Sequence, residues 1–206
     1  MEKSKQEPKI DDFYKNMDKA ISMIDSDVSF LIAAFNAVEA EEGPIVHVYE
    51  QFRIIPFVFL SYKDIITLSK LLIKCGEEAD QTAENIIART LAIHFYEFIE
   101  DMGQVIGSRM RAQIKDLPRQ ELLNLKLNLV AEYFQTIKDN YKKKVEEVRL
   151  NVSAHKDFDV RKQIEIIKNV NSDIYKELFV LTTGFFLAFH DFFKHFRESI
   201  KEMSSE

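Results

Sequence analysis

The chain has 206 residues, of which 46% are hydrophobic and 30% charged, with a formal net charge of −6 at pH 7. A chain of this length can bury a sufficient hydrophobic core without disulfides or structural metals. Its single cysteine, Cys75, excludes an internal disulfide and a cysteine-based zinc site. Five glycines and four prolines are few, which favours long uninterrupted elements over a turn-rich β fold. We expect one all-α domain over residues 1–206, an up-and-down bundle of five to six helices.

The start of the chain, residues 1–12, is charged and lacks the apolar stretch of a signal peptide. The longest run without charge, residues 178–189, is too short to span a bilayer. These features predict a cytoplasmic protein without a membrane segment. The net negative charge argues against a general nucleic-acid coat protein but is compatible with a local basic site.

Residues 10–38 carry apolar side chains at alternating steps of three and four, which is typical of a helix with one buried face. The apolar pattern of residues 44–75 predicts a second, less regular helical segment. We expect a kink or break in it near residues 53–55, because Pro56 removes a backbone hydrogen bond. Gly76 suits the C-terminal cap of this segment.

A third helix is predicted over residues 80–115, with His94 on its apolar face. Arg89 and His94 are five residues apart, so they diverge by about 140° on a straight helix, which disfavours joint chemistry. His94 is most simply a hydrogen-bonded histidine of the core or of a subunit contact. Glu97 lies on the same side and could orient it, although acidic residues in such a run usually form a solvated face.

Pro118 suits the start of a fourth helix, whose apolar stripe extends to Val148. This helix leads into a stretch with a guanidinium, an amide, a hydroxyl and an imidazole, which belong to Arg149, Asn151, Ser153 and His155. An imidazole can move the proton of a 2′-hydroxyl, and a fixed guanidinium can hold the charge that builds on phosphoryl oxygens. The stretch therefore suits phosphodiester chemistry that needs no metal or other cofactor.

Residues 142–162 contain seven basic and four acidic side chains, within a chain of net negative charge. A positive patch around the motif would attract a phosphate backbone. The alternative is that residues 142–144 form a solvated helix end that offsets the helix macrodipole.

A short helix is predicted over residues 160–169, with Asp159 as its N-cap, followed by a long helix over residues 172–201. This last helix has two adjacent apolar stripes and so needs two burial partners. One is the bundle core. The other is either a second subunit or, alternatively, another part of the same chain.

Three polar residues of the last helix, His190, Asp191 and His195, invite comparison with a metal site. Asp191 and His195 are four residues apart on one face. Two such groups make an incomplete ligand set, so we expect a structural role and no metal.

The stretch from Arg149 to Asp157 resembles the motif of the HEPN superfamily, whose helical bundles carry Arg-x4-6-His near the end of a core helix. Here five residues separate Arg149 from His155, and Ala154–Asp157 is similar to the Ala-His-x-Asp run of abortive-infection-type members. The resemblance covers roughly residues 80–200, with the helices of residues 9–75 packed on this core.

The resemblance implies a metal-independent endoribonuclease, often a toxin or antiphage effector, with sites built across a homodimer. His155 would be the general base or acid, and Arg149 would stabilise the transition state. Supporting roles would fall to Asn151, Ser153, Lys156 and Asp157, with His94 and Glu97 as contributors from the preceding core helix. A cognate antitoxin or regulator protein is an implied partner.

One position departs from the family pattern, which usually has a polar residue directly after the arginine. This chain has Leu150 there and Asn151 one place later, a shift that turns a helical side chain by about 100°. The alternative function is a non-catalytic helical module that binds RNA, a nucleotide or a partner protein. A purely structural dimeric bundle is a third alternative.

Overall fold

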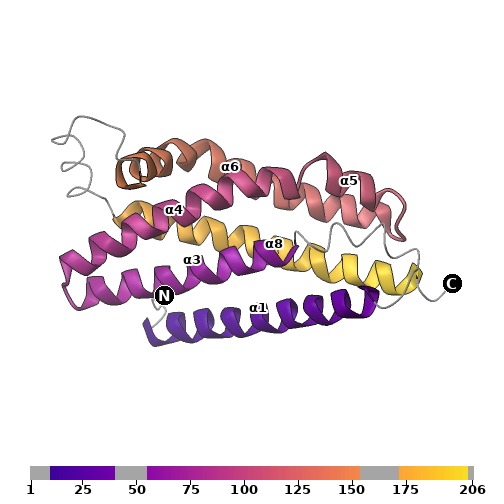
Figure 1. Ribbon diagram of the computed structural model, residues 1–206, viewed down its shortest axis with the longest axis horizontal. Helices are drawn as coiled ribbons and strands as arrows, with labels where there is room; N and C mark the ends of the chain where they lie inside the picture. The colour runs from indigo at the N-terminus through magenta and orange to yellow at the C-terminus, as the bar shows by residue number, and fades with distance from the viewer. Residues whose placement is uncertain (1–9, 40–54, 154–171, 204–206) are drawn as a thin grey trace, which may run out of the picture.

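The computed structural model describes residues 10–39, 55–153 and 172–203 (Figure 1). These residues form helices and no strand: α1 (Ile10–Glu39), α3 (Ile55–Glu77), α4 (Gln81–Val105), α5 (Ser108–Ile114), α6 (Gln120–Ser153) and α8 (Ser172–Met203). The expected all-α bundle is confirmed. The helix expected at residues 160–169 and the chain before Ile55, where a kink was expected, lie outside the described residues.

Four long helices, α3, α4, α6 and α8, run alternately in opposite directions and form the centre of the molecule (Figure 1). α3 packs on α4, α4 on α6, α6 on α8 and α8 on α3, so each helix buries a stripe against two neighbours. We call this arrangement the four-helix core. None of the described helices contains a stretch long and apolar enough to cross a membrane.

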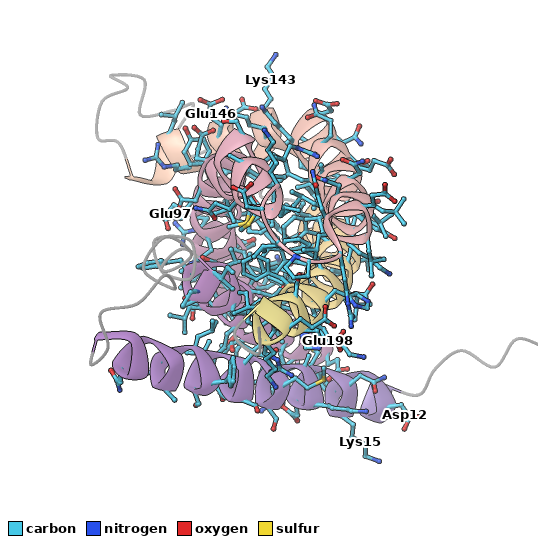
Figure 2. The ribbon with its side chains drawn as sticks, turned by 90° about the vertical axis from the view of Figure 1, so that its right-hand side faces the viewer. Asp12, Lys15, Glu97, Lys143, Glu146 and Glu198 are labelled. Carbon is cyan, nitrogen blue, oxygen red and sulfur yellow. The ribbon has the colours of Figure 1, made fainter. Side chains whose placement is uncertain are left out.

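α1 lies outside this core, where it packs on α3 and runs obliquely to the other helices (Figures 1 and 2). Its side chains Met17, Ile24 and Leu31 are buried in the same apolar cluster as the core residues. The one-sided stripe predicted for residues 10–38 is therefore confirmed in its central part.

Both apolar stripes of α8 are buried within the chain. The buried rings, each at most 1% exposed, come from both stripes: Phe185, Phe192, Phe189 and Phe193. The ring of Phe189 meets Phe59 of α3 edge to face at 5.7 Å between centroids, and Phe185 meets Phe98 of α4 at 5.1 Å. Such aromatic pairs contribute about 0.5–1.5 kcal/mol beyond the area they bury. The second stripe therefore packs against other helices of the same chain, which is the alternative named for it above.

The turn between α3 and α4 differs from the prediction. Gly76 lies inside the last turn of α3, and the left-handed residue is Ala79, with φ of 56°. The amide of Ala79 donates to the carbonyl of Gly76 at 3.3 Å, and that of Asp80 to Cys75 at 3.0 Å, the two bonds of a Schellman motif. The carboxylate of Asp80 in turn accepts the amide of Ala83 at 3.0 Å and caps α4. The prediction of a cap at Gly76 is wrong because these bonds place the turn three residues later.

The single helix predicted over residues 80–115 is also wrong, since it breaks between α4 and α5 at Ile106 and Gly107. Gly107 has an extended conformation, with φ of −78° and ψ of −158°, and glycine is a poor helix former. The change of direction lets Ile106, Met110 and Ile114 be buried while α5 contacts both α4 and α6. Apolar burial thus offsets the helical hydrogen bonds lost at the break.

α6 begins at Gln120, two residues later than the predicted start at Pro118. Arg119, between them, has a left-handed φ of 60°. Its guanidinium donates to Glu198 of α8 at 3.0 Å and also to Glu202. These ion pairs join the start of α6 to the end of α8.

Candidate functional site

α6 carries Arg149 to one end of the four-helix core (Figure 1). The buried stripe of this helix ends with Tyr141 and Val145, and Val148 continues it as a partly buried residue. Arg149, the next residue, is half-buried. Its predicted position at the border of the apolar stripe agrees with the structure.

The guanidinium of Arg149 lies over the ring of Tyr96 on α4, with its Cζ atom 4.4 Å from the ring centroid. Tyr96 is itself half-buried between the two helices. A guanidinium stacked on an aromatic face gains about 0.5–1 kcal/mol at a partly exposed site. The contact with the ring orients the side chain of Arg149 at the border between α4 and α6.

A second contact fixes the same pair of helices. Lys142 of α6 lies 2.6 Å from the carboxylate of Glu100 on α4, and this hydrogen bond raises the pKa of Lys142 above its ordinary value. Glu100 lies one helical turn from Tyr96, and Lys142 lies two turns from Arg149, so both contacts belong to one seam between α4 and α6.

The structure describes only the backbone of some of the other predicted motif residues, and the rest lie outside the described residues. Asn151 and Ser153 lie in the last turn of α6, but their side chains lie outside the described structure. His155, Lys156 and Asp157 lie beyond the described residues. The structure therefore positions the cationic half of the predicted pair.

His94 and Glu97, the predicted contributors from the preceding helix, are both on α4. A helix turns by about 100° per residue, so His94 points about 160° away from Tyr96, which contacts Arg149. Glu97 is exposed on the outer surface of α4 (Figure 2). Arg89, the other arginine considered, donates from Nε to the carbonyl of Asn85 in its own helix at 3.2 Å.

Tyr96 is the functional candidate that the sequence analysis missed. Its position on α4 could be read from the helical periodicity, but its contact with Arg149 depends on the relative register of two helices separated by α5. The opposite charges of Glu100 and Lys142 are a sequence signal that is consistent with this register, although many other acidic and basic pairs could be formed between the two helices.

The basic run of α6 is spread around the helix. Lys142 is paired with Glu100, whereas Lys144 lies over the ring of Tyr141 at 5.0 Å. Lys143 is exposed and points away from the bundle, on the side opposite α1 (Figure 2). This part of the run therefore resembles a solvated helix surface more than a single focused patch.

His195 and Asp191 of α8 lie close to charged side chains. The carboxylate of Asp191 lies 2.6 Å from Lys126 of α6, and this hydrogen bond lowers the pKa of Asp191 below its ordinary value. His195 lies 3.7 Å from Asp191 and 3.4 Å from Glu198. Within the described residues no group of three or more histidine, cysteine or acidic side chains is arranged to hold a metal ion.

Comparisons of the chain with known protein families, curated proteins and solved structures give no match. The HEPN resemblance therefore depends on the residues of the motif.

Proposed function

We propose that the protein is a metal-independent endoribonuclease in which Arg149 and His155 act together on an RNA phosphodiester. The contact between Arg149 and Tyr96 is the observation that carries this proposal. It orients a permanent cation at the half-buried edge of the core, six residues before an imidazole. A guanidinium is always charged and matches two phosphate oxygens in geometry, so an oriented arginine suits recognition of a phosphodiester.

In the proposed reaction His155 accepts the proton of the 2′-hydroxyl while its oxygen attacks the adjacent phosphorus. The bond from phosphorus to the 5′-oxygen breaks, and that oxygen takes up a proton. Arg149 stabilises the negative charge on the non-bridging oxygens of the transition state. The products are a 2′,3′-cyclic phosphate and a 5′-hydroxyl, so the atoms balance without a metal or a redox partner.

The motif resemblance further leads us to propose a homodimer in which the two copies of the motif face each other. Leu150, next to Arg149, is 48% exposed although it is apolar. A contact between the ends of two α6 helices would cover this side chain. The site would then contain an arginine and a histidine from each subunit.

The test is cleavage of a mixed-sequence RNA panel in EDTA by the wild type, Arg149→Ala and His155→Ala. Arg197→Ala is the matched control, because its guanidinium also lies over an aromatic ring, that of Phe30, at 4.8 Å. We expect loss of at least 100-fold in rate for the two motif variants and little change for the control, consistent with general acid–base catalysis. Circular dichroism and sizing would show that all variants fold and assemble alike.

Cleavage products distinguish the proposal from contamination. Cyclic-phosphate ends that appear only with the wild type and the control would support it. Equal cleavage by all four proteins, or no cleavage by any, would contradict it.

The exposed Leu150 also favours a second candidate, a helical module that binds RNA or a partner without cleaving it. An apolar side chain at this position suits a binding surface better than a polar catalytic shell. RNA binding that weakens with salt and persists in His155→Ala, without cleavage, would support the binding module.

A further inference from the structure

A groove separates α1 from α8, with α3 as its floor. Two cavities of about 260 Å³ each form it, and they are continuous because they share Asn16, Ala20, Tyr62 and Thr183. The lining residues of α1 extend from Asn16 to Asp27, which corresponds to about 16 Å at 1.5 Å per helical residue. α1 packs mainly on α3, and it meets α8 at Asp27 and Phe30, which contact His190 and Arg197.

The walls of the groove are apolar. Its apolar lining residues come from three helices: Ala20 and Met23 of α1, Phe59 and Tyr62 of α3, and Val180 and Leu187 of α8. The ring of Tyr62 is stacked on Phe186 at 3.4 Å and forms part of the floor. Thr183 adds little polarity, because its hydroxyl donates to the carbonyl of Phe179 at 2.8 Å. Water in such a space has few hydrogen-bond partners.

One end of the groove is polar and negatively charged. The side chain of Asp27 is 14% exposed, and no residue in the described part of the chain donates a hydrogen bond to its buried Oδ2 atom. Nδ1 of His190 lies 3.0 Å from this oxygen, at ion-pair distance. The nearest lysine of α3, Lys63, is paired with Asp25 at 2.5 Å. A buried carboxylate oxygen without a donor is costly, so this end suits a ligand that brings a donor or a positive charge.

We propose that this groove binds a linear cationic amphiphile. The alkyl chain lies between α1 and α8 over Tyr62, and the ammonium group lies at Asp27. The rim supports a chain-like ligand, since Val180 and Leu187 are both 66% exposed and would be covered by it. The combined volume falls in the range of about 300–1,000 Å³ that is common for small-molecule sites. This binding is independent of the proposed ribonuclease.

Calorimetric titration of the full chain with dodecylammonium chloride below its micellar concentration tests the proposal. We expect it to bind at least tenfold more tightly than hexylammonium, which has the same head, and dodecanoate, which has the same chain and opposite charge. Absence of binding, or equal affinity for dodecanoate, would overturn the proposal.

Variants locate the binding. Ala20 lines both cavities, so Ala20→Phe fills the groove and should lower the affinity at least tenfold. Ala33→Phe is its matched control, because Ala33 is an exposed residue of the same helix outside the groove. Asp27→Asn should remove the preference for the cation. Unchanged affinity in both phenylalanine variants would show general attraction of a cation to a chain of net charge −6, and an equal loss in both would show an effect unrelated to the groove; either result would overturn the site.

A rim variant keeps the test valid if Ala20→Phe does not fold. Leu187→Ser should lower the affinity severalfold, whereas Leu125→Ser on α6, which is equally exposed at 66%, should not. Equal effects of the two serine variants would overturn the proposal. Sizing of the wild type and Ala20→Phe excludes another occupant: a dimer that Ala20→Phe dissociates would show that a second copy fills the groove.

Discussion

The four-helix core and the outer helix α1 are held by different kinds of contact. In the core, rings from α3, α4, α6 and α8 meet one another, and α8 is buried along two adjacent stripes. Among the α1 side chains that the structure describes, the large buried ones are seven residues apart, at Met17, Ile24 and Leu31, and partly buried residues flank them. Each core helix packs on two neighbours, whereas α1 packs mainly on α3, along a seam beside an open groove.

Polar contacts reinforce the seam at its edges. Lys63 pairs with Asp25 and Lys70 with Asp18, each at 2.5 Å and partly exposed. Exposed pairs of this kind contribute about 0–1 kcal/mol each. The seam is therefore expected to open at a lower free energy than the core, which would suit a groove that admits a ligand.

The largest expected effect tests the core. Phe185 is fully buried and its ring meets Phe98, Phe186 and Phe189. Phe185→Ala should lower the free energy of unfolding by about 3–5 kcal/mol, because it removes apolar contacts and leaves a cavity. Urea unfolding would measure this, with Val180→Ala, at an exposed position of the same helix, as a control within about 0.5 kcal/mol of the wild type. A loss below 1 kcal/mol for Phe185→Ala would contradict the packing of α8.

A smaller effect is expected for the matching change in the seam. Leu31 is fully buried on α1, and Leu31→Ala should cost about 2–3 kcal/mol, near the lower end for such changes, because α1 can settle into the vacated space. Limited proteolysis would show faster cleavage within α1 while the core fragment stays intact. Cleavage of α1 and of the core at the same rate would mean that they unfold as one unit, and it would contradict the proposed difference in stability between them.

The sequence predicted the long helices well, because each presents a continuous apolar stripe. α1 and α8 begin and end within two residues of their predicted limits. The break at Ile106 and Gly107 was missed because a regular apolar pattern continues through it. Only packing against α6 shows that the residues beyond the break are buried in another direction.

The candidate site was predictable in part, for a similar reason. The border position of Arg149 follows from the period of α6 alone. Its contact with Tyr96 depends on the register of α4 against α6, and the groove depends on the oblique path of α1 across α3. Neither the register of two helices nor the path of α1 can be predicted from the spacing of residues within one helix.

The smallest expected effect lies in the turn between α3 and α4, where the sequence and the structure assign the left-handed residue differently. Ala79 has φ of 56°, so Ala79→Gly should stabilise the protein by about 0.5–1 kcal/mol through relief of the steric cost of its Cβ. Gly76 is helical, and a Cβ there would meet Oε1 of Glu84 at 3.9 Å, an ordinary contact. Gly76→Ala should therefore also stabilise, by up to about 1 kcal/mol.

If Gly76 were the C-terminal cap of α3 instead, neither substitution would stabilise the protein. In that case Gly76→Ala would force alanine into the left-handed region and lower the unfolding temperature, while Ala79→Gly would add flexibility and give no gain. Thermal unfolding of both variants and of the double variant separates the two assignments. If the hydrogen bonds of Ala79 and Asp80 fix the turn where the structure has it, the unfolding temperature of the double variant should rise by the sum of the two single effects. The reason is that glycine at position 79 relieves strain beyond the end of α3, whereas alanine at position 76 stabilises the helix itself.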